Sequence, residues 1–119
     1  MVMYNQLPIF RDSYELLLKI YQETSQFAKD YKYSLGQDMK RDCLNMIRDI
    51  YFANMNVQQR QEYLDSFFGN LELLKMEIRL SIDLKVMSVR KQAHLSLLID
   101  TIAKQAKAWR KKSAEINEK

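Results

Sequence analysis

Proline and glycine are almost absent from this chain, which has one proline and two glycines in 119 residues. A domain made of many short strands needs both residue types at its turns, so their scarcity favours long helices with few connections. Hydrophobic residues make up 47% of the chain, too many for a disordered tail. The length matches one ordinary domain. We therefore expect a single all-α domain that spans residues 1–119.

Hydrophobic periodicity divides the chain into four amphipathic segments. Apolar residues recur at intervals of three and four, the spacing that gives a helix one buried face. The pattern predicts helices over about residues 9–27, from Ser34 to about residue 54, after Asn56, and after Ser88. Short connections between long amphipathic helices are typical of an antiparallel up-down-up-down four-helix bundle. We expect both ends of this domain, about residues 1–7 and 113–119, to fray.

Polar residues before three of the predicted helices are candidate N-caps. Ser34, Asn56 and Ser88 can each accept a hydrogen bond from a free amide of the following turn. Gly36 falls inside the first turn of the second predicted helix, although glycine there costs up to roughly 1 kcal/mol against alanine. We expect that the missing side chain lets a neighbouring helix approach closely. A phosphate at the helix N-terminus is the alternative, and the carboxylate of Asp38 argues against it.

The third predicted helix is apolar on two nearly opposite sides. One side runs from Leu64 to Ile82 and the other from Leu73 to Leu84. Because a bundle helix needs only one buried face, the second side would leave an apolar patch in water unless something covers it. Either a wide face packs within the bundle, or the second side is a subunit interface shared with a second stripe on the first predicted helix. We expect the interface, which comprises Ile9, Leu16, Ile20, Leu73, Met76, Leu80 and Leu84.

Positive charge is concentrated in the fourth predicted helix. The net charge is +4, yet residues 85–112 alone hold eight lysines and arginines against one acid. At 100° per residue, four of these cations share about a quarter-turn of the helix surface: Arg90, Lys104, Lys107 and Lys111. Such a row attracts phosphate backbones through counterion release, without reading their sequence. A solvated helix face is the alternative, since a helix C-terminus favours lysine in any case.

Motifs for catalysis are missing from the sequence. It contains no phosphate-binding loop, no dinucleotide-binding glycine pattern and no cluster of metal ligands. The lone histidine, His94, is expected at the surface, and Cys43 falls on an apolar helix face where a buried structural thiol is expected. An unrecognised site around His94 or Asp100 is the remaining enzymatic alternative. We predict a protein that is not an enzyme and that binds no metal or cofactor.

Cysteine usage and hydropathy indicate where the protein acts. A single cysteine cannot form an internal disulfide, which favours a reducing, cytoplasmic setting. The N-terminal residues lack the basic start and the unbroken apolar run of a signal peptide. No apolar run approaches the roughly 20 residues of a membrane span. We expect a cytoplasmic protein with no membrane partner.

Two stretches are more specific than a generic bundle requires: YSLGQDMKRD, which begins at Tyr33, and LLKMEIRL, which begins at Leu73. Together with IRDIYFAN and IAKQAKAWRKK, they resemble the Avd family, the accessory variability determinants of diversity-generating retroelements. The likeness covers roughly residues 7–112. The Avd family is part of a wider family of bacterial four-helix bundles. That wider family also contains proteins encoded in intervening sequences of large-subunit ribosomal RNA genes.

The resemblance implies a function that neither periodicity nor charge predicts. It implies a homopentameric barrel of four-helix bundles that binds the retroelement's reverse transcriptase and nucleic acid, mainly template RNA and possibly DNA. It also implies a scaffolding role in mutagenic retrohoming, in which the polymerase performs the chemistry. The basic positions that match the family are Arg79, Lys85 and the cations from Lys104 to Lys112. With the cations found by counting, the candidate nucleic-acid-binding residues are Arg79, Lys85, Arg90, Lys91, Lys104, Lys107, Arg110, Lys111 and Lys112.

Two further interpretations remain open at this point. The chain resembles the ribosomal RNA intervening-sequence branch about as well as the retroelement branch, so the sequence separates the two poorly. A protein-interaction module without a nucleic-acid role, whose basic helix contacts an acidic protein, also fits the charge pattern. Salt-dependent RNA binding distinguishes the nucleic-acid-binding retroelement function from a protein-interaction module.

Overall fold

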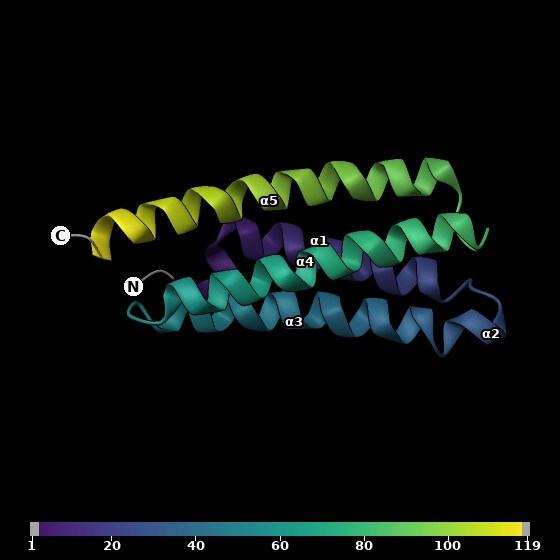
Figure 1. The fold of residues 1–119 in the computed structure, drawn as a ribbon, viewed down its shortest axis with the longest axis horizontal. Coiled ribbons are helices and arrows are strands. Elements are labelled where there is room, and N and C mark those ends of the chain that lie inside the picture. Colours follow the sequence, from purple (N-terminus) through teal and green to yellow (C-terminus); the bar gives the residue numbers. More distant parts are fainter. Residues whose placement is uncertain (1–2, 118–119) are drawn as a thin grey trace.

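The structure is a computed structural model that describes residues 3–117. Within these residues every regular element is helical, and four long helices lie side by side in a body of 51 × 21 × 21 Å (Figure 1). The elements in chain order are η1 (Tyr4–Gln6), α1 (Pro8–Thr24), α2 (Lys29–Lys32), α3 (Leu35–Met55), α4 (Arg60–Asp83) and α5 (Val89–Asn117). The predicted all-α four-helix bundle is therefore confirmed.

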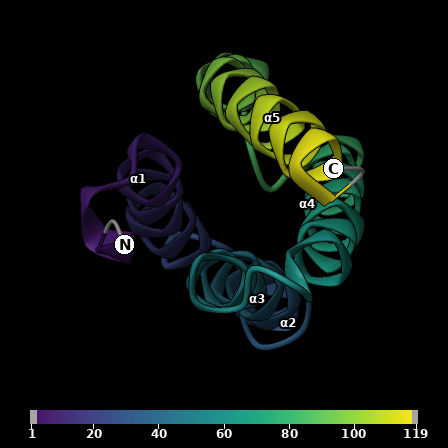
Figure 2. The same cartoon turned by 90° about the vertical axis from the view of Figure 1, so that its left-hand side faces the viewer.

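The long helices follow one another around the bundle in chain order. Viewed along its length, α1 packs on α3, α3 on α4 and α4 on α5, and α5 returns to α1 (Figure 2). The α3–α4 contact is the most extensive of the four. Each helix turns one apolar face to the common core, where Leu16, Met46, Phe67 and Ile102 are completely buried.

The ends of the helices differ from the sequence prediction in several places. The first helix ends at Thr24 rather than near residue 27, and the single turn α2 follows it. Helical backbone in α5 continues to Asn117, although we expected fraying from residue 113. At the N-terminus, the ring of Tyr4 packs edge-on against Phe10 and Tyr51 at 5.1 and 5.0 Å, so part of the expected frayed segment has tertiary contacts. Residues 1, 2, 118 and 119 lie outside the described part.

One of the three predicted N-caps is confirmed. The backbone amide of Lys91 donates a hydrogen bond to the Ser88 hydroxyl over 3.2 Å, directly before α5. Ser34 precedes α3 as expected, but its hydroxyl donates to the Asp30 carbonyl over 2.9 Å and caps no amide of α3. The prediction for Asn56 was wrong, since its side-chain amide donates to the Phe52 carbonyl at the end of α3.

Gly36 lies where the end of α1 crosses the start of α3, and the expected close approach is confirmed. Gly36 is buried. A Cβ atom placed on it would lie 3.3 Å from the Thr24 Cβ and 3.4 Å from the Tyr31 carbonyl oxygen. The Thr24 hydroxyl is itself fixed, because it donates to the Ile20 carbonyl over 2.8 Å. The glycine therefore sets how closely α1 and α3 approach at this end of the bundle.

The turn between α4 and α5 is made by Lys85 in the left-handed conformation, with φ at 63°. The amide of Lys85 donates to the Ile82 carbonyl, and the amide of Val86 donates to the Ser81 carbonyl, both over 2.9 Å. This pair of hydrogen bonds is the Schellman ending of a helix, in which glycine usually takes the left-handed position. Lys85 is therefore part of the turn that reverses the chain.

Candidate nucleic-acid and subunit interfaces

The basic surface of α5 follows from the amphipathic pattern of that helix. Leu95, Ile99, Ile102 and Ala106 enter the core, and the opposite face of α5 is solvent-exposed. Four of the predicted binding residues gather on the last part of this face, all exposed and without an ion-pair partner among residues 3–117: Lys104, Lys107, Lys111 and Lys112. We call these four residues the lysine cluster.

Two of the predicted binding cations are committed to the bundle. The Lys91 ammonium lies 3.1 Å from a carboxylate oxygen of Glu23 on α1. The Arg110 guanidinium lies 3.5 Å from a carboxylate oxygen of Asp65 and 4.2 Å from the centre of the Phe68 ring, both on α4. These contacts hold α5 against its two neighbours, so a phosphate would have to compete with them.

The remaining predicted cations lie away from the lysine cluster. Arg90 is exposed at the start of α5, about 14 residues or roughly 21 Å of helix before Lys104, and Lys85 is exposed in the turn that precedes α5. The acid Asp100 is exposed on the stretch between them. The row predicted from the sequence is thus interrupted, and only its last third is a dense group of cations.

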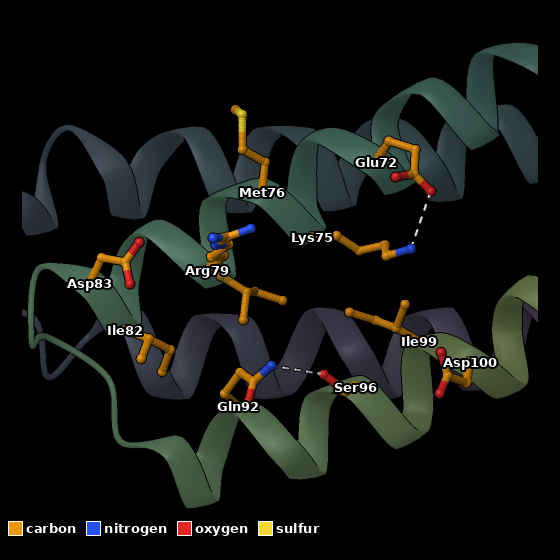
Figure 3. Close-up of a pocket in the computed structure, with 11 residues that line it drawn as sticks. Glu72, Lys75, Met76, Arg79, Ile82, Asp83, Gln92, Ser96, Ile99 and Asp100 are labelled. Carbon is orange, nitrogen blue, oxygen red and sulfur yellow. Dashed lines mark hydrogen bonds and ion pairs between the residues drawn. The ribbon is translucent and has the colours of Figure 1, made fainter.

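Arg79 lines a groove of about 610 Å³ between α4 and α5, shown in Figure 3. The other charged residues of this groove are mostly acids: Glu72, which pairs with Lys75 over 3.3 Å, and also Asp83 and Asp100. The groove is thus of mixed charge. The structure does not bring Arg79 together with the lysine cluster.

The residues of the predicted subunit interface divide into an exposed set on α4 and a buried set on α1. Its four residues on α4 form an exposed stripe, with exposed fractions from 37% to 58%: Leu73, Met76, Leu80 and Leu84. The three residues on α1 were wrong for an interface, because Ile9, Leu16 and Ile20 are at most 5% exposed and belong to the core. Packing of α1 against both α3 and α5 buries this side of the helix.

The side of α1 that remains exposed is the other apolar stripe, and it joins a matching stripe on α3. The exposed apolar residues on the two helices are Tyr14, Leu18, Tyr21, Leu44, Tyr51 and Met55. The two stripes are continuous across the helix boundary, since the Lys40 ammonium of α3 lies 5.1 Å from the Tyr21 ring centre and Tyr4 touches both Phe10 and Tyr51. We call this set the α1–α3 surface.

Three buried carboxyl groups lie along the α3–α4 contact, and neither charge pattern nor periodicity predicts their burial. Asp42 on α3 is only 2% exposed, and Glu77 on α4 is 6% exposed. Burial raises the pKa of Glu77 to about 8, reinforced by its hydrogen bond to Asp42 and by the charge of that residue. Arg41 lies 3.2 Å from Asp42 and opposes this rise. Glu77 is therefore protonated at neutral pH.

The third buried carboxylate, Asp49, is held by two donors from α4. The Ser66 hydroxyl and the Asn70 side-chain amide donate to the same oxygen of Asp49 over 2.9 and 3.0 Å. Burial raises the pKa of Asp49, although both hydrogen bonds and Arg48 oppose the rise. The sequence shows that Asp49 is acidic, but the hydrogen-bond donors that allow its burial lie on the facing helix α4.

The remaining reactive side chains fit structural roles. Burial raises the pKa of the Cys43 thiol to about 12, helped by the charge of Asp42, so the thiol stays uncharged at neutral pH. His94 is exposed on α5. No group of three or more potential metal ligands is found within residues 3–117. None of the helices in this range combines the length and the hydrophobicity needed to cross a membrane.

Comparison with known proteins adds one positive finding. A family model described as bAvd-like matches residues 1–113 of the chain, which includes all of α1, α3 and α4 and most of α5. A search of the curated proteins found no match.

Proposed function

Because this chain belongs to the bAvd-like family, we propose that it is the accessory protein of a diversity-generating retroelement and binds nucleic acid through the lysine cluster of α5. The family consists of accessory, non-catalytic proteins. We propose that the reverse transcriptase is the protein partner, that template RNA is the main nucleic-acid ligand, with DNA as a second, and that the complex serves mutagenic retrohoming. In this function the polymerase performs all the chemistry.

One observation carries the nucleic-acid part of the proposal: four lysines within nine residues are exposed on the outer face of α5 and have no ion-pair partner in the described part of the chain. Elsewhere the cations of α5 that contact acids, Lys91 and Arg110, stabilise the bundle. A dense group of unpaired cations attracts phosphates of any sequence by releasing their counterions. This predicts binding of single-stranded and structured RNA with little sequence preference and strong dependence on salt.

We further propose that the chain acts as a homo-oligomer, most simply a pentamer of about 72 kDa from five copies of 14.3 kDa. Two exposed apolar surfaces, the α4 stripe and the α1–α3 surface, support self-association. In an oligomer the lysine cluster is repeated around the assembly, so several weak phosphate contacts act on one RNA. We place the protein in the cytoplasm, where Cys43 stays reduced.

The test is RNA binding as a function of salt. The triple variant Lys104→Glu, Lys107→Glu, Lys111→Glu should lose RNA binding at low salt while its circular dichroism and oligomeric mass stay unchanged. A matched triple variant with the same charge change outside α5, at Lys29, Lys32 and Lys75, should keep most of its affinity. If the α5 variant binds RNA as the wild type does, the lysine cluster is not the binding surface.

Genomic position tests the family branch independently. An adjacent reverse transcriptase gene with paired template and variable repeats would support the retroelement function. Location of the gene inside a ribosomal RNA operon would overturn it in favour of the intervening-sequence branch. An oligomer that binds no RNA at any salt concentration would favour the protein-interaction module.

A further inference from the structure

A small apolar pocket lies between the start of α1 and the last part of α5, the part that carries the lysine cluster. Both segments belong to the same end of the bundle (Figures 1 and 2). The pocket has a volume of about 260 Å³ and is lined by Leu7, Pro8, Ile9, Gln105 and Trp109. Typical ligand sites measure roughly 300–1,000 Å³, so this one suits a single ring system rather than a large ligand. We call it the Trp109 pocket.

The α5 wall of the Trp109 pocket is fixed by contacts with two other helices. The Gln105 side-chain amide donates a hydrogen bond to the carboxylate of Asp12 on α1 over 2.8 Å. The Arg60 guanidinium of α4 lies 5.4 Å from the centre of the Trp109 ring, and it is itself held by donating to the Ala53 carbonyl over 2.7 Å. The half-buried indole is therefore in place before any ligand binds, which lowers the entropy lost on binding.

Cations flank the pocket on both of its walls. Lys112 of the lysine cluster is exposed and follows Trp109 by three residues, which places the two side by side on α5. Arg11 is exposed and follows Pro8 by three residues on α1. Neither cation has an ion-pair partner among residues 3–117. A ligand that combines a flat apolar ring with phosphates on either side of it matches this arrangement.

We propose that the Trp109 pocket receives one unpaired nucleobase of an RNA whose phosphates are bound by the lysine cluster. The proposal rests on the nucleic-acid function proposed above and names the part of the RNA that is bound. Stacking of a base on an aromatic side chain tolerates any sequence, because every base has a flat π face. Bases inside a continuous duplex are paired and stacked, so they cannot enter the pocket. The site thus selects unpaired segments over duplex without reading sequence.

The fluorescence of Trp109 tests the pocket directly, because the chain has no other tryptophan. The wild-type protein is titrated at low salt with an oligouridine strand, with an RNA duplex of the same length and with inorganic polyphosphate, which has phosphates but no bases. All three should bind the lysine cluster, but only the oligouridine should quench the indole. Equal quenching by polyphosphate or duplex would overturn the proposal, as would a bound oligouridine that leaves the fluorescence unchanged.

Substitution of the indole gives an independent measurement. Trp109→Leu should weaken oligouridine binding by roughly 5- to 100-fold, the scale on which an aromatic platform contributes to the affinity for a base. Its affinity for duplex and polyphosphate should stay at the wild-type value. Trp109→Phe keeps a flat ring and should retain most of the oligouridine affinity. An equal loss for all three ligands would show that Trp109 acts only through the fold, and would overturn the base pocket.

Tyr33 provides the matched control. Its ring is 63% exposed and lies 5.8 Å from the ammonium of Lys32, so it also places an aromatic ring beside a lysine. Tyr33 directly follows α2, which lies at the opposite end of the bundle from the Trp109 pocket (Figure 1). Tyr33→Leu should therefore leave oligouridine binding unchanged. A loss as large as that of Trp109→Leu would mean that the pocket has no special role.

The three ligands also separate this inference from the proposed function. If the wild-type protein binds none of them, the nucleic-acid function is wrong and the base pocket falls with it. If it binds all three without a change in indole fluorescence, only the base pocket is wrong. That result would leave the pocket to an apolar side chain of a protein partner, while the lysine cluster would remain a phosphate-binding surface.

Discussion

Asp42 on α3 and Glu77 on α4 are two buried carboxyl groups that face each other across the α3–α4 contact. Both side chains are almost completely buried, and the pKa of Glu77 is raised to about 8 by burial, by the hydrogen bond to Asp42 and by its negative charge. Asp38 acts in the same direction at longer range, and Arg41 acts against it. The tightest helix pair of the bundle thus contains an acid that must lose its proton as the pH rises.

This pair makes the stability of the bundle depend on pH. The folded protein holds the Glu77 proton up to about pH 8, whereas the unfolded chain releases it near pH 4.5, so the free energy of unfolding falls as the pH rises through this window. Glu77→Gln keeps the shape and a donor toward Asp42 without an ionisable proton. We expect Glu77→Gln to be more stable than the wild type at pH 8 by about 1–3 kcal/mol, with a smaller difference at pH 5.

Urea denaturation at a series of pH values measures this dependence. Glu72→Gln on the exposed side of α4 is the matched control and should follow the wild-type curve, because Glu72 makes only a solvent-exposed pair with Lys75. Equal slopes for Glu77→Gln and the wild type between pH 5 and 8 would show that the folded protein does not retain the Glu77 proton in this range.

The two glycines should respond in opposite directions to alanine. Nothing lies within 4 Å of a Cβ atom on Gly69, so Gly69→Ala should stabilise α4 by about 0.5–1 kcal/mol through helix propensity alone. At Gly36 the same gain is opposed by the contacts at 3.3 and 3.4 Å with Thr24 and the Tyr31 carbonyl. We expect Gly36→Ala to lose about 1 kcal/mol net. Melting temperatures of the two variants give the comparison, and a gain at Gly36 equal to that at Gly69 would refute close packing.

Periodicity predicts those parts of the fold in which one helix face is buried. It found the four long helices because each has an apolar stripe at helical spacing. Both stripes of α1 have helical spacing, so periodicity alone did not choose between them. The aliphatic residues Ile9, Leu16 and Ile20 were the better candidates for burial, because the stripe around Leu18 is rich in tyrosine. In the structure α3 and α5 cover the aliphatic stripe. The single turn α2 is too short to show a period.

The same limit applies to the candidate site. A count of charges found the basic helix α5, but it could not show that Lys91 and Arg110 contact acids on α1 and α4. Nor could it show that Asp42 and Asp49 are buried, because the groups that face these two carboxylates lie on another helix, α4. Contacts between helices are set by packing, and a single sequence carries no record of which residues face one another.

Arg110 should behave as a structural residue and not as a phosphate ligand. Its guanidinium lies over the Phe68 ring at 4.2 Å, and its carbonyl accepts a hydrogen bond from the Gln61 side chain over 2.9 Å. Arg110→Lys keeps the charge but loses the planar stacking, so we expect about 0.5–1 kcal/mol lower stability with unchanged RNA affinity. Lys107→Ala should give the reverse pattern, with normal stability and weaker RNA binding. A drop in RNA affinity for Arg110→Lys as large as that for Lys107→Ala would place Arg110 in the binding surface.

Lys85 has a left-handed backbone conformation and also carries a positive charge. Two substitutions distinguish the contribution of the backbone from that of the charge. A side chain at φ 63° costs about 1 kcal/mol relative to glycine, so Lys85→Gly should raise the stability of the bundle by about 0.5–1 kcal/mol. Lys85→Ala removes the same charge but keeps a Cβ atom, and it should gain little. If Lys85 also contacts phosphate, both variants should weaken RNA binding equally, because they lose the same ammonium group. Thermal unfolding and RNA titration of the two variants answer both points, and a Lys85→Gly variant no more stable than Lys85→Ala would show that the turn stores no strain.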